Sequence, residues 1–210
     1  MISILCYGDS NTWGYNPATS RRFAEEDRWV CILQRWLGTD YKIIPEGLNG
    51  RTTMRDDPFE GAHKNGLTYL PACIESHKPL DLVAVMLGTN DLKTRFSAAP
   101  IDVAQGAGKL VTIIQASDTG INGKAPIVLL IAPPSFGKLT GYADNFANGE
   151  EKSKLFDKYY RQIAELQGCY YLNAGDHVNS SPIDGIHLEA PEQRKLGEAV
   201  AKKVGEIFRG

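Results

Sequence analysis

The sequence predicts an α/β protein, a three-layer α/β/α sandwich with a five-stranded parallel sheet in its middle. Three observations predict it. Five short apolar runs alternate along the chain with amphipathic helical patterns. The central runs are apolar throughout, as in strands that helices cover on both faces. Polar, glycine-containing segments follow the strands, where open α/β sheets place their ligand sites.

The strands come first, and each is a short run rich in apolar and β-branched residues. Leu82–Leu87 and Ile127–Ala132 contain no polar residue, which indicates burial on both faces. The first and last runs are also short and lie between helical patterns. The predicted strands are Ile2–Tyr7, Tyr41–Pro45, Leu82–Leu87, Ile127–Ala132 and Cys169–Leu172.

Between and after these strands, apolar residues recur with the 3.6-residue period of an amphipathic helix. The stripes are carried by Trp29, Ile32, Leu33, Trp36 and Leu37, by Leu67, Leu70 and Ile74, by Val103, Leu110 and Ile114, by Phe156, Tyr160, Ile163 and Leu166, and by Val200, Val204 and Ile207. Strict alternation of strand and helix favours right-handed crossovers and a flavodoxin-like strand order, 2-1-3-4-5. No linker divides the chain, so we expect one domain over residues 1–210.

Composition narrows the function classes. A net charge of −2 without a basic run argues against a nucleic-acid partner. No apolar run reaches the roughly 20 residues of a membrane helix, and the N-terminus lacks the pattern of a signal peptide. Four scattered cysteines, with no CxxC pair, favour buried free thiols over disulfides or metal ligands. We therefore expect a cytoplasmic protein with no membrane partner.

Four polar segments carry the unusual residues: Gly8–Asn11, Gly47–Thr53, Gly88–Asp91 and Asp184–His187. Each comes after a predicted strand. In a flavodoxin-like sheet the first and third strands flank the point where strand order reverses. The segments after them are therefore expected to meet across one crevice.

These segments hold the parts of a serine nucleophile. Ser10 lies at a strand-to-helix turn, and His187 is the candidate base that takes its proton. Asp184, three residues earlier, can hold the imidazole in the required tautomer. The Ser10 N–H, the Gly50 N–H and the Asn90 side-chain amide are candidate donors to an oxyanion.

Taken one at a time, these features have ordinary structural explanations. A Gly-Asp-Ser sequence is often only a turn, and Asp-Gly is a common turn as well. Asn90 or Asp91 could cap a helix, and this is the better interpretation of Asp91. A single histidine such as His187 is more often a surface or capping residue. The functional hypothesis depends on all four segments occurring together, in this order, at strand ends.

In that order, the four segments resemble those of the SGNH (GDSL-like) hydrolase superfamily, over essentially the whole chain. The resemblance implies Ser10, Asp184 and His187 as a catalytic triad, and Ser10, Gly50 and Asn90 as oxyanion donors. The sequence departs from it at Asn11, where leucine is common. The G-x-S-x-G elbow of α/β-hydrolases is absent, because residue 12 is threonine.

Longer stretches are similar to a bacterial arylesterase and acyltransferase branch: Gly8–Gly14, Arg28-Trp29, Glu46–Leu48, Arg51–Thr53, Asp56–Pro58, Tyr69–Pro71, Pro79–Leu82 and Met86–Asp91. This resemblance implies hydrolysis of short-chain acyl or aryl esters, with acyl transfer to alcohols as a further activity. It also implies a homo-oligomer as the functional form.

Several other residues are candidates with open alternatives. Asn11 and Trp13 are the expected substrate contacts, and Tyr15 could add an aromatic wall, although core packing explains the aromatic residues equally well. His63 could line the pocket, whereas His77 ends a helix and has the better case for a structural role. The segment Pro133–Gly149 is rich in Gly, Pro and Asn. Its Phe136, Tyr142 and Phe146 would form a substrate lid or an oligomer contact, or would be exposed loop aromatics.

Three rival functions remain open. A carbohydrate O-deacetylase would use the same triad on another substrate. A nucleotide-binding module would need G-x-x-x-x-G-K-[ST] or G-x-G-x-x-G, and neither is present. A non-catalytic scaffold would not need the complete triad set. No H-x-x-H or H-E-x-x-H sequence predicts a metal, and no cofactor is expected.

Overall fold

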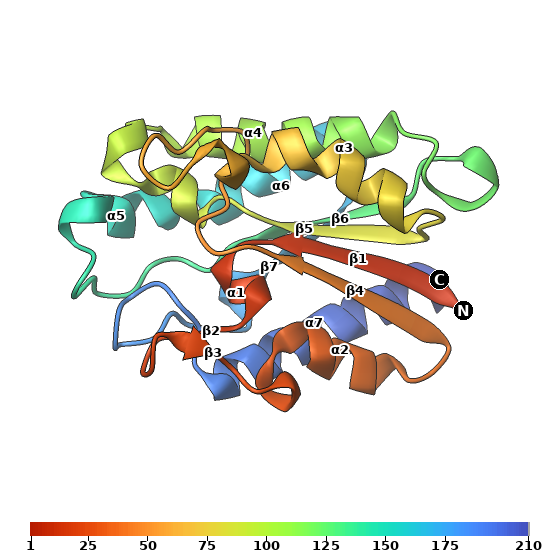
Figure 1. The fold of residues 1–210 in the computed structure, drawn as a ribbon, viewed down its shortest axis with the longest axis horizontal. Coiled ribbons are helices and arrows are strands. Elements are labelled where there is room, and N and C mark those ends of the chain that lie inside the picture. Colours follow the sequence, from red (N-terminus) through yellow and green to blue (C-terminus); the bar gives the residue numbers. More distant parts are fainter. Residues whose placement is uncertain (210) are drawn as a thin grey trace.

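The computed structural model describes residues 1–209 and confirms the predicted three-layer sandwich (Figure 1). Its main sheet has the order β4-β1-β5-β6-β7 with every pair parallel, which is the predicted order 2-1-3-4-5. The strands are β1 (Ile2–Gly8), β4 (Tyr41–Gly47), β5 (Leu82–Met86), β6 (Ile127–Ala132) and β7 (Tyr170–Asn173).

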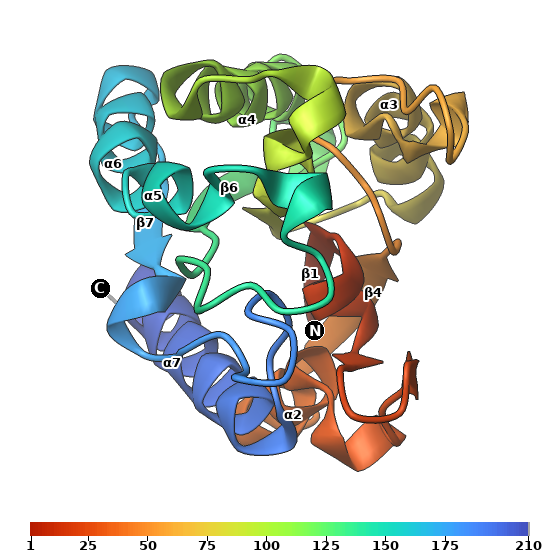
Figure 2. The same cartoon turned by 90° about the vertical axis from the view of Figure 1, so that its left-hand side faces the viewer.

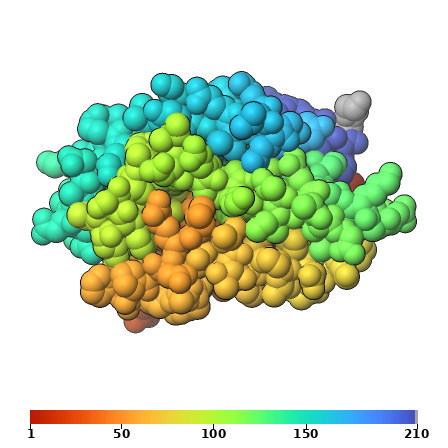
Figure 3. Space-filling view, turned by 90° about the horizontal axis from the view of Figure 1, so that it is seen from above, coloured from red at the N-terminus to blue at the C-terminus, as the bar shows by residue number. Residues whose placement is uncertain are grey.

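Helices cover both faces of this sheet. α3 (Gly66–His77), α4 (Pro100–Gln115) and α6 (Phe156–Gln167) lie on one face, and Figure 3 shows them side by side. α2 (Trp29–Leu37) and α7 (Ala190–Arg209) pack together on the other face. There are two shorter helices: α1 (Ser10–Trp13) follows β1, and α5 (Gly149–Ser153) comes directly before α6. The five predicted helical stripes correspond to α2, α3, α4, α6 and α7.

The core is split in two by the sheet, as strands apolar on both faces require. One half joins the sheet to α3, α4 and α6 and contains the buried aromatic rings of Phe156 and Tyr160. The other half joins it to α2 and α7 and contains Trp29. All five residues of β5 are buried, which explains why this strand shows no alternation in the sequence.

Two local features were not predicted. A small antiparallel hairpin, β2 (Tyr15–Asn16) with β3 (Arg21–Arg22), follows α1. Each of its strands has two residues, too few for any periodic signal. The segment after β6 is also more ordered than its composition suggests, because Phe136 and Phe146 are buried in the core.

The four polar segments gather at one end of the molecule. Figure 2 views this end, where the carboxyl ends of the strands meet α1 and the loops after β6 and β7. The parallel sheet brings them there because every strand runs in the same direction. Within residues 1–209, no helix combines the length and the apolar character that crossing a membrane requires.

Candidate active site

The turn between β1 and α1 presents Ser10. Asp9 caps the short helix: its Oδ1 accepts the Asn11 N–H at 3.0 Å, and its carbonyl accepts the N–H groups of Thr12 and Trp13. Ser10 is the first residue of the helix, where an N–H has no intrahelical acceptor. No acceptor among the described residues binds that N–H. It is therefore free to donate to a ligand at the Ser10 side chain.

Ser10, His187 and Asp184 form a continuous hydrogen-bonded chain. The Oγ of Ser10 lies 2.9 Å from Nε2 of His187, and Nδ1 of His187 lies 2.6 Å from Oδ2 of Asp184. The other oxygen of Asp184 accepts the N–H groups of Ile186 and His187, at 2.8 and 2.9 Å. One carboxylate thus fixes both the turn and the imidazole ring. The arrangement is that of a serine nucleophile with its base and orienting acid.

The Asp184 carboxyl group is held in its charged form. Burial would raise the pKa of Asp184, but the hydrogen bond and charge of His187, together with two backbone N–H groups, outweigh burial and lower it. Asp9 shows the opposite balance. Its complete burial raises the pKa to about 6, despite the Asn11 N–H and the neighbouring His187.

Two further donors border the same space. Gly50 has a φ of +79°, a conformation that glycine adopts readily, and a Cβ there would collide with a Glu60 carboxylate oxygen. Its N–H has no acceptor within the described chain. The Nδ2 of Asn90 donates to the Arg51 carbonyl at 3.1 Å, which leaves the second hydrogen of that amide for a ligand. Both residues line the pocket that contains Ser10.

Buried polar side chains hold these donor loops in place. The Arg51 guanidinium donates to the Gly8 carbonyl at 3.0 Å and stacks over the Tyr7 ring at 4.2 Å. Asp91 accepts the Thr53 N–H at 2.9 Å and the Thr53 hydroxyl at 2.5 Å, which ties the loop after β5 to the loop after β4. Complete burial raises the pKa of Asp91 to about 6, although the Thr53 hydrogen bonds act against it.

These elements enclose a pocket of about 180 Å³, below the usual range for drug-sized ligands. We call Ser10, Tyr15, Tyr142, Phe146, Ile186 and His187 the triad wall. Glu60, Lys93 and Arg95 form the charged wall. Asn49, Gly50, Asn90 and Asn145 complete the lining. The small volume fits a short acyl group.

A buried ionic network supports the charged wall. Lys93 Nζ lies 3.2 Å from Asp57 Oδ2 and 2.5 Å from Glu60 Oε1, and Arg95 adds a 3.0 Å pair with Asp57. The Asp57 side chain is 0% exposed and also accepts the Phe59 and Glu60 N–H groups. Burial opposes ionisation of Asp57, but those N–H groups and Lys93 prevail and lower its pKa.

The triad wall is closed by aromatic rings. Tyr15 lies against the His187 imidazole, with ring centroids 4.1 Å apart. A hydrogen bond with Tyr15, followed by burial, raises the pKa of Tyr142 to about 12. Phe146 packs edge-on against Phe136 at 5.4 Å. Of the predicted possibilities for the loop aromatics, exposure is therefore wrong for Phe136 and Phe146, which anchor the segment in the core.

Several candidates lie elsewhere than the sequence suggested. Asn11 is 1% exposed, and its Oδ1 accepts the Leu188 N–H at 3.0 Å, so it braces the His187 loop from behind and does not line the pocket. Trp13 packs under Arg22 and is absent from the lining, and His63 lines a different hollow. Asp91 makes no helix-cap bond. The sequence missed the lining residues Glu60, Lys93, Arg95 and Asn145, which no motif marks.

The cysteines are free thiols, as expected. Cys6 and Cys73 are buried, whereas Cys31 and Cys169 are only partly buried. Burial raises the pKa of Cys6, Cys73 and Cys169. None of the four lines the pocket that contains Ser10. The cysteines therefore take no part in the serine site.

Fold and site together define an ester-hydrolysing enzyme of the serine hydrolase class. Residues 6–192 match the GDSL-like lipase/acylhydrolase family, and the chain belongs to that family. The predicted SGNH resemblance is thereby confirmed. A search of curated proteins finds no match.

Solved structures support the same assignment. The chain is 42% identical to Est24, a carbohydrate acetylesterase from Sinorhizobium meliloti, with a TM-score of 0.95 over 99% of this chain and 100% of that one. It is 39% identical to the native M. smegmatis aryl esterase, with a TM-score of 0.93 over 98% and 99%. A lipase/acylhydrolase from Enterococcus faecalis, 18% identical with a TM-score of 0.70 over 99% and 97%, shares the fold.

Proposed function

We propose that this protein hydrolyses short-chain acyl or aryl esters through an acyl-enzyme on Ser10. The observation that carries the proposal is the unbroken contact from Ser10 Oγ through His187 to Asp184 beside a pocket of about 180 Å³. A pocket of that volume has room for an acetyl or similarly short acyl group. Longer chains would have to extend past the loop aromatics.

In the proposed reaction, Ser10 Oγ attacks the ester carbonyl carbon while His187 Nε2 takes the hydroxyl proton. The negative oxygen that forms is stabilised by the N–H groups of Ser10 and Gly50 and by the Asn90 amide. The C–O bond to the alcohol then breaks, and His187 returns the proton to that alcohol. Water repeats the sequence to release the acid, with His187 again serving as base and then acid.

A carbohydrate O-deacetylase is the second candidate. The chain's similarity to a carbohydrate acetylesterase supports it. The charged wall supports it too, because Glu60, Lys93 and Arg95 offer both acceptors and donors to sugar hydroxyls. An aryl group would make little use of those charges. A panel of acetylated sugars and aryl acetates at matched concentrations, compared by kcat/KM, separates the two.

The test of the proposed nucleophile is Ser10→Ala, with Ser117→Ala, two residues after α4 ends, as its matched control. We expect turnover of p-nitrophenyl acetate to fall by roughly 10⁶-fold, toward the residual rate that binding and donors alone supply. Ser117→Ala should retain wild-type turnover. Wild-type rates in Ser10→Ala would sink the proposal.

Acyl transfer and self-association are further parts of the proposal. Acyl transfer requires an alcohol to replace water at the acyl-enzyme, and product analysis with added alcohol tests it.

Phe59 is 80% exposed and stacks with the pocket residue Arg95, which supports a homo-oligomer contact at the pocket rim. Light scattering of the wild type and Phe59→Ser would test that contact. The cytoplasmic location stays a prediction.

A further inference from the structure

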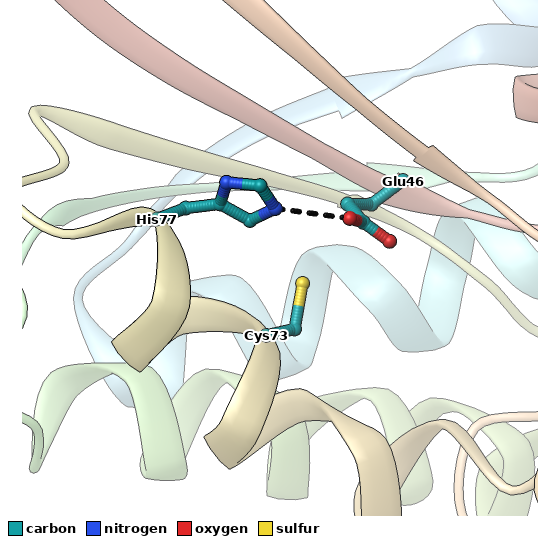
Figure 4. A group of neighbouring side chains, drawn as sticks. All are labelled: Glu46, Cys73 and His77. Atoms are coloured by element: carbon teal, nitrogen blue, oxygen red, sulfur yellow. Dashed lines mark hydrogen bonds and ion pairs between the residues drawn. The ribbon is translucent and has the colours of Figure 1, made fainter.

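A group of side chains outside the catalytic pocket joins β4 to the end of α3. Cys73 and His77 are four residues apart on α3 and therefore share one helix face. Glu46 reaches them from β4, and the ligand atoms of the three residues all lie within 4.8 Å of one another. Figure 4 shows the Cys73 thiol beside the hydrogen-bonded pair of His77 and Glu46. A thiol, an imidazole and a carboxylate thus converge on one point.

We propose that Glu46, Cys73 and His77 form a binding site for a zinc ion, separate from the serine site. Sulfur, nitrogen and oxygen are the three donor types that zinc takes in proteins, at bond lengths of about 2.0–2.3 Å. Harder ions such as Mg²⁺ and Ca²⁺ would take oxygen ligands and would not select a thiol. The donor set therefore points to zinc among the common divalent ions.

The present separations of the ligand atoms are close to those around a bound zinc ion. Tetrahedral bonds of that length place ligand atoms about 3.3–3.8 Å apart, so a modest contraction from the present spacing is needed. Cys73 is 0% exposed and fixed by its packing, whereas the His77 and Glu46 side chains are 32% and 20% exposed and can rotate. Their Nε2 and Oε1 atoms, now 3.0 Å apart, would separate slightly as the ion comes between them.

Two of the three ligands border solvent, since the His77 and Glu46 side chains are 32% and 20% exposed. Glu46 lines an open hollow of about 530 Å³, together with Tyr69 and Ala72 of the α3 turn before Cys73. In the proposed site, a water molecule would supply the fourth ligand. Three protein ligands with one open position are the pattern of an exchangeable zinc site rather than a closed structural one.

The charges balance when zinc binds. Burial, followed by the negative charge of Glu46, raises the pKa of the Cys73 thiol to about 12, so the thiol is protonated at neutral pH. Binding forms a Zn–S bond and releases the thiol proton to water. Zn²⁺, one thiolate and one carboxylate sum to zero charge. The bound site is neutral overall, which is one positive charge more than the protonated thiol and the carboxylate carry before binding.

The experiment uses the full chain, without an affinity tag and freed of metal by a chelator. We expect one equivalent of Zn²⁺ to bind by calorimetry. Co²⁺ in its place should give the thiolate-to-metal charge-transfer absorption of a cysteine ligand. Cys73→Ser should abolish that absorption, and His77→Ala and Glu46→Gln should each weaken Zn²⁺ binding by about 100-fold or more.

Two controls separate this site from others. His63→Ala removes a histidine of the same hollow that is not in the cluster, and Ser10→Ala alters the serine site. Both should bind Zn²⁺ as the wild type does. Unchanged binding in both Cys73→Ser and His77→Ala, no binding by the wild type, or loss of binding in either control would overturn the assignment. His77 is partly exposed, so its variant tests the site even if Cys73→Ser folds poorly.

Discussion

The two walls of the pocket are built on different physical principles. The triad wall presents the Ser10 hydroxyl and the His187 imidazole, which Asp184 holds from behind, together with aromatic and aliphatic side chains. The charged wall gathers two cations and one carboxylate around the buried carboxylate of Asp57. In the proposed reaction the first wall makes and breaks bonds, and the second orients polar groups of the substrate. Substitutions in the first should change turnover, and those in the second should change stability and substrate preference.

The largest effect is expected on the triad wall, from Asp184→Asn. An amide in place of the carboxylate can hold the imidazole in the wrong tautomer and cannot stabilise the imidazolium. We expect kcat for p-nitrophenyl acetate to fall by roughly 10⁴-fold. Asp118→Asn, an exposed acid after α4, is the matched control and should leave kcat unchanged. A loss below tenfold would mean that Asp184 does not orient the base.

On the charged wall, Lys93→Met should act mainly on stability. It leaves Asp57 and Glu60 with Arg95 alone, and Asp57 has no access to water. We expect the free energy of unfolding to fall by about 3 kcal/mol in urea titrations. Lys154→Met breaks an exposed pair with Glu151 and should cost no more than about 0.5 kcal/mol. Equal losses in the two variants would remove the distinction between buried and surface pairs.

In the loop after β5, the buried Asp91 should produce a pH-dependent effect. Burial raises its pKa from the ordinary 3.8 to about 6, so the folded chain holds a proton there that the unfolded chain has lost. Its contribution to stability is complete below pH 3.8 and is lost as pH rises through about 6. The substitution Asp91→Asn keeps the geometry of the protonated acid and removes the titrating group.

The measurement is urea unfolding of the wild type and Asp91→Asn from about pH 4 to about pH 7, a range that spans the folded-state pKa. We expect the stability of the variant relative to the wild type to improve as pH rises across that range, because only the wild type ionises a buried carboxyl. Asp184 and Asp57 titrate in both chains, so their contributions cancel in the difference. A difference independent of pH would show that Asp91 titrates as an ordinary carboxyl.

The contrast between the walls also explains what the sequence could predict. The buried apolar runs predicted the strands, and their alternation with helices predicted the strand order. The convergence of Ser10, Asn90 and His187 followed from parallel strands that end at one edge. The charged wall was missed because Lys93 pairs with residues 33 and 36 positions away, and no local pattern marks such pairs. Asn11 was misinterpreted for the same reason, since its partner Leu188 is 177 residues distant.

The smallest expected effect returns to the triad wall, at Tyr15. Its ring lies 4.1 Å from the His187 ring and can stabilise the imidazolium that forms when Ser10 loses its proton. A cation–π contact of this kind contributes about 1 kcal/mol, so Tyr15→Leu should lower kcat about fivefold. It should also move the acid limb of the kcat/KM profile to lower pH, because the protonated imidazole loses a stabilising contact. Tyr15→Phe keeps the ring and should preserve both properties, although it loses the hydroxyl contact with Tyr142. If Tyr15→Phe instead loses as much activity as Tyr15→Leu, the hydroxyl contact with Tyr142 supports catalysis rather than the ring. The triad wall would then depend on polar contacts between its side chains, as the charged wall does.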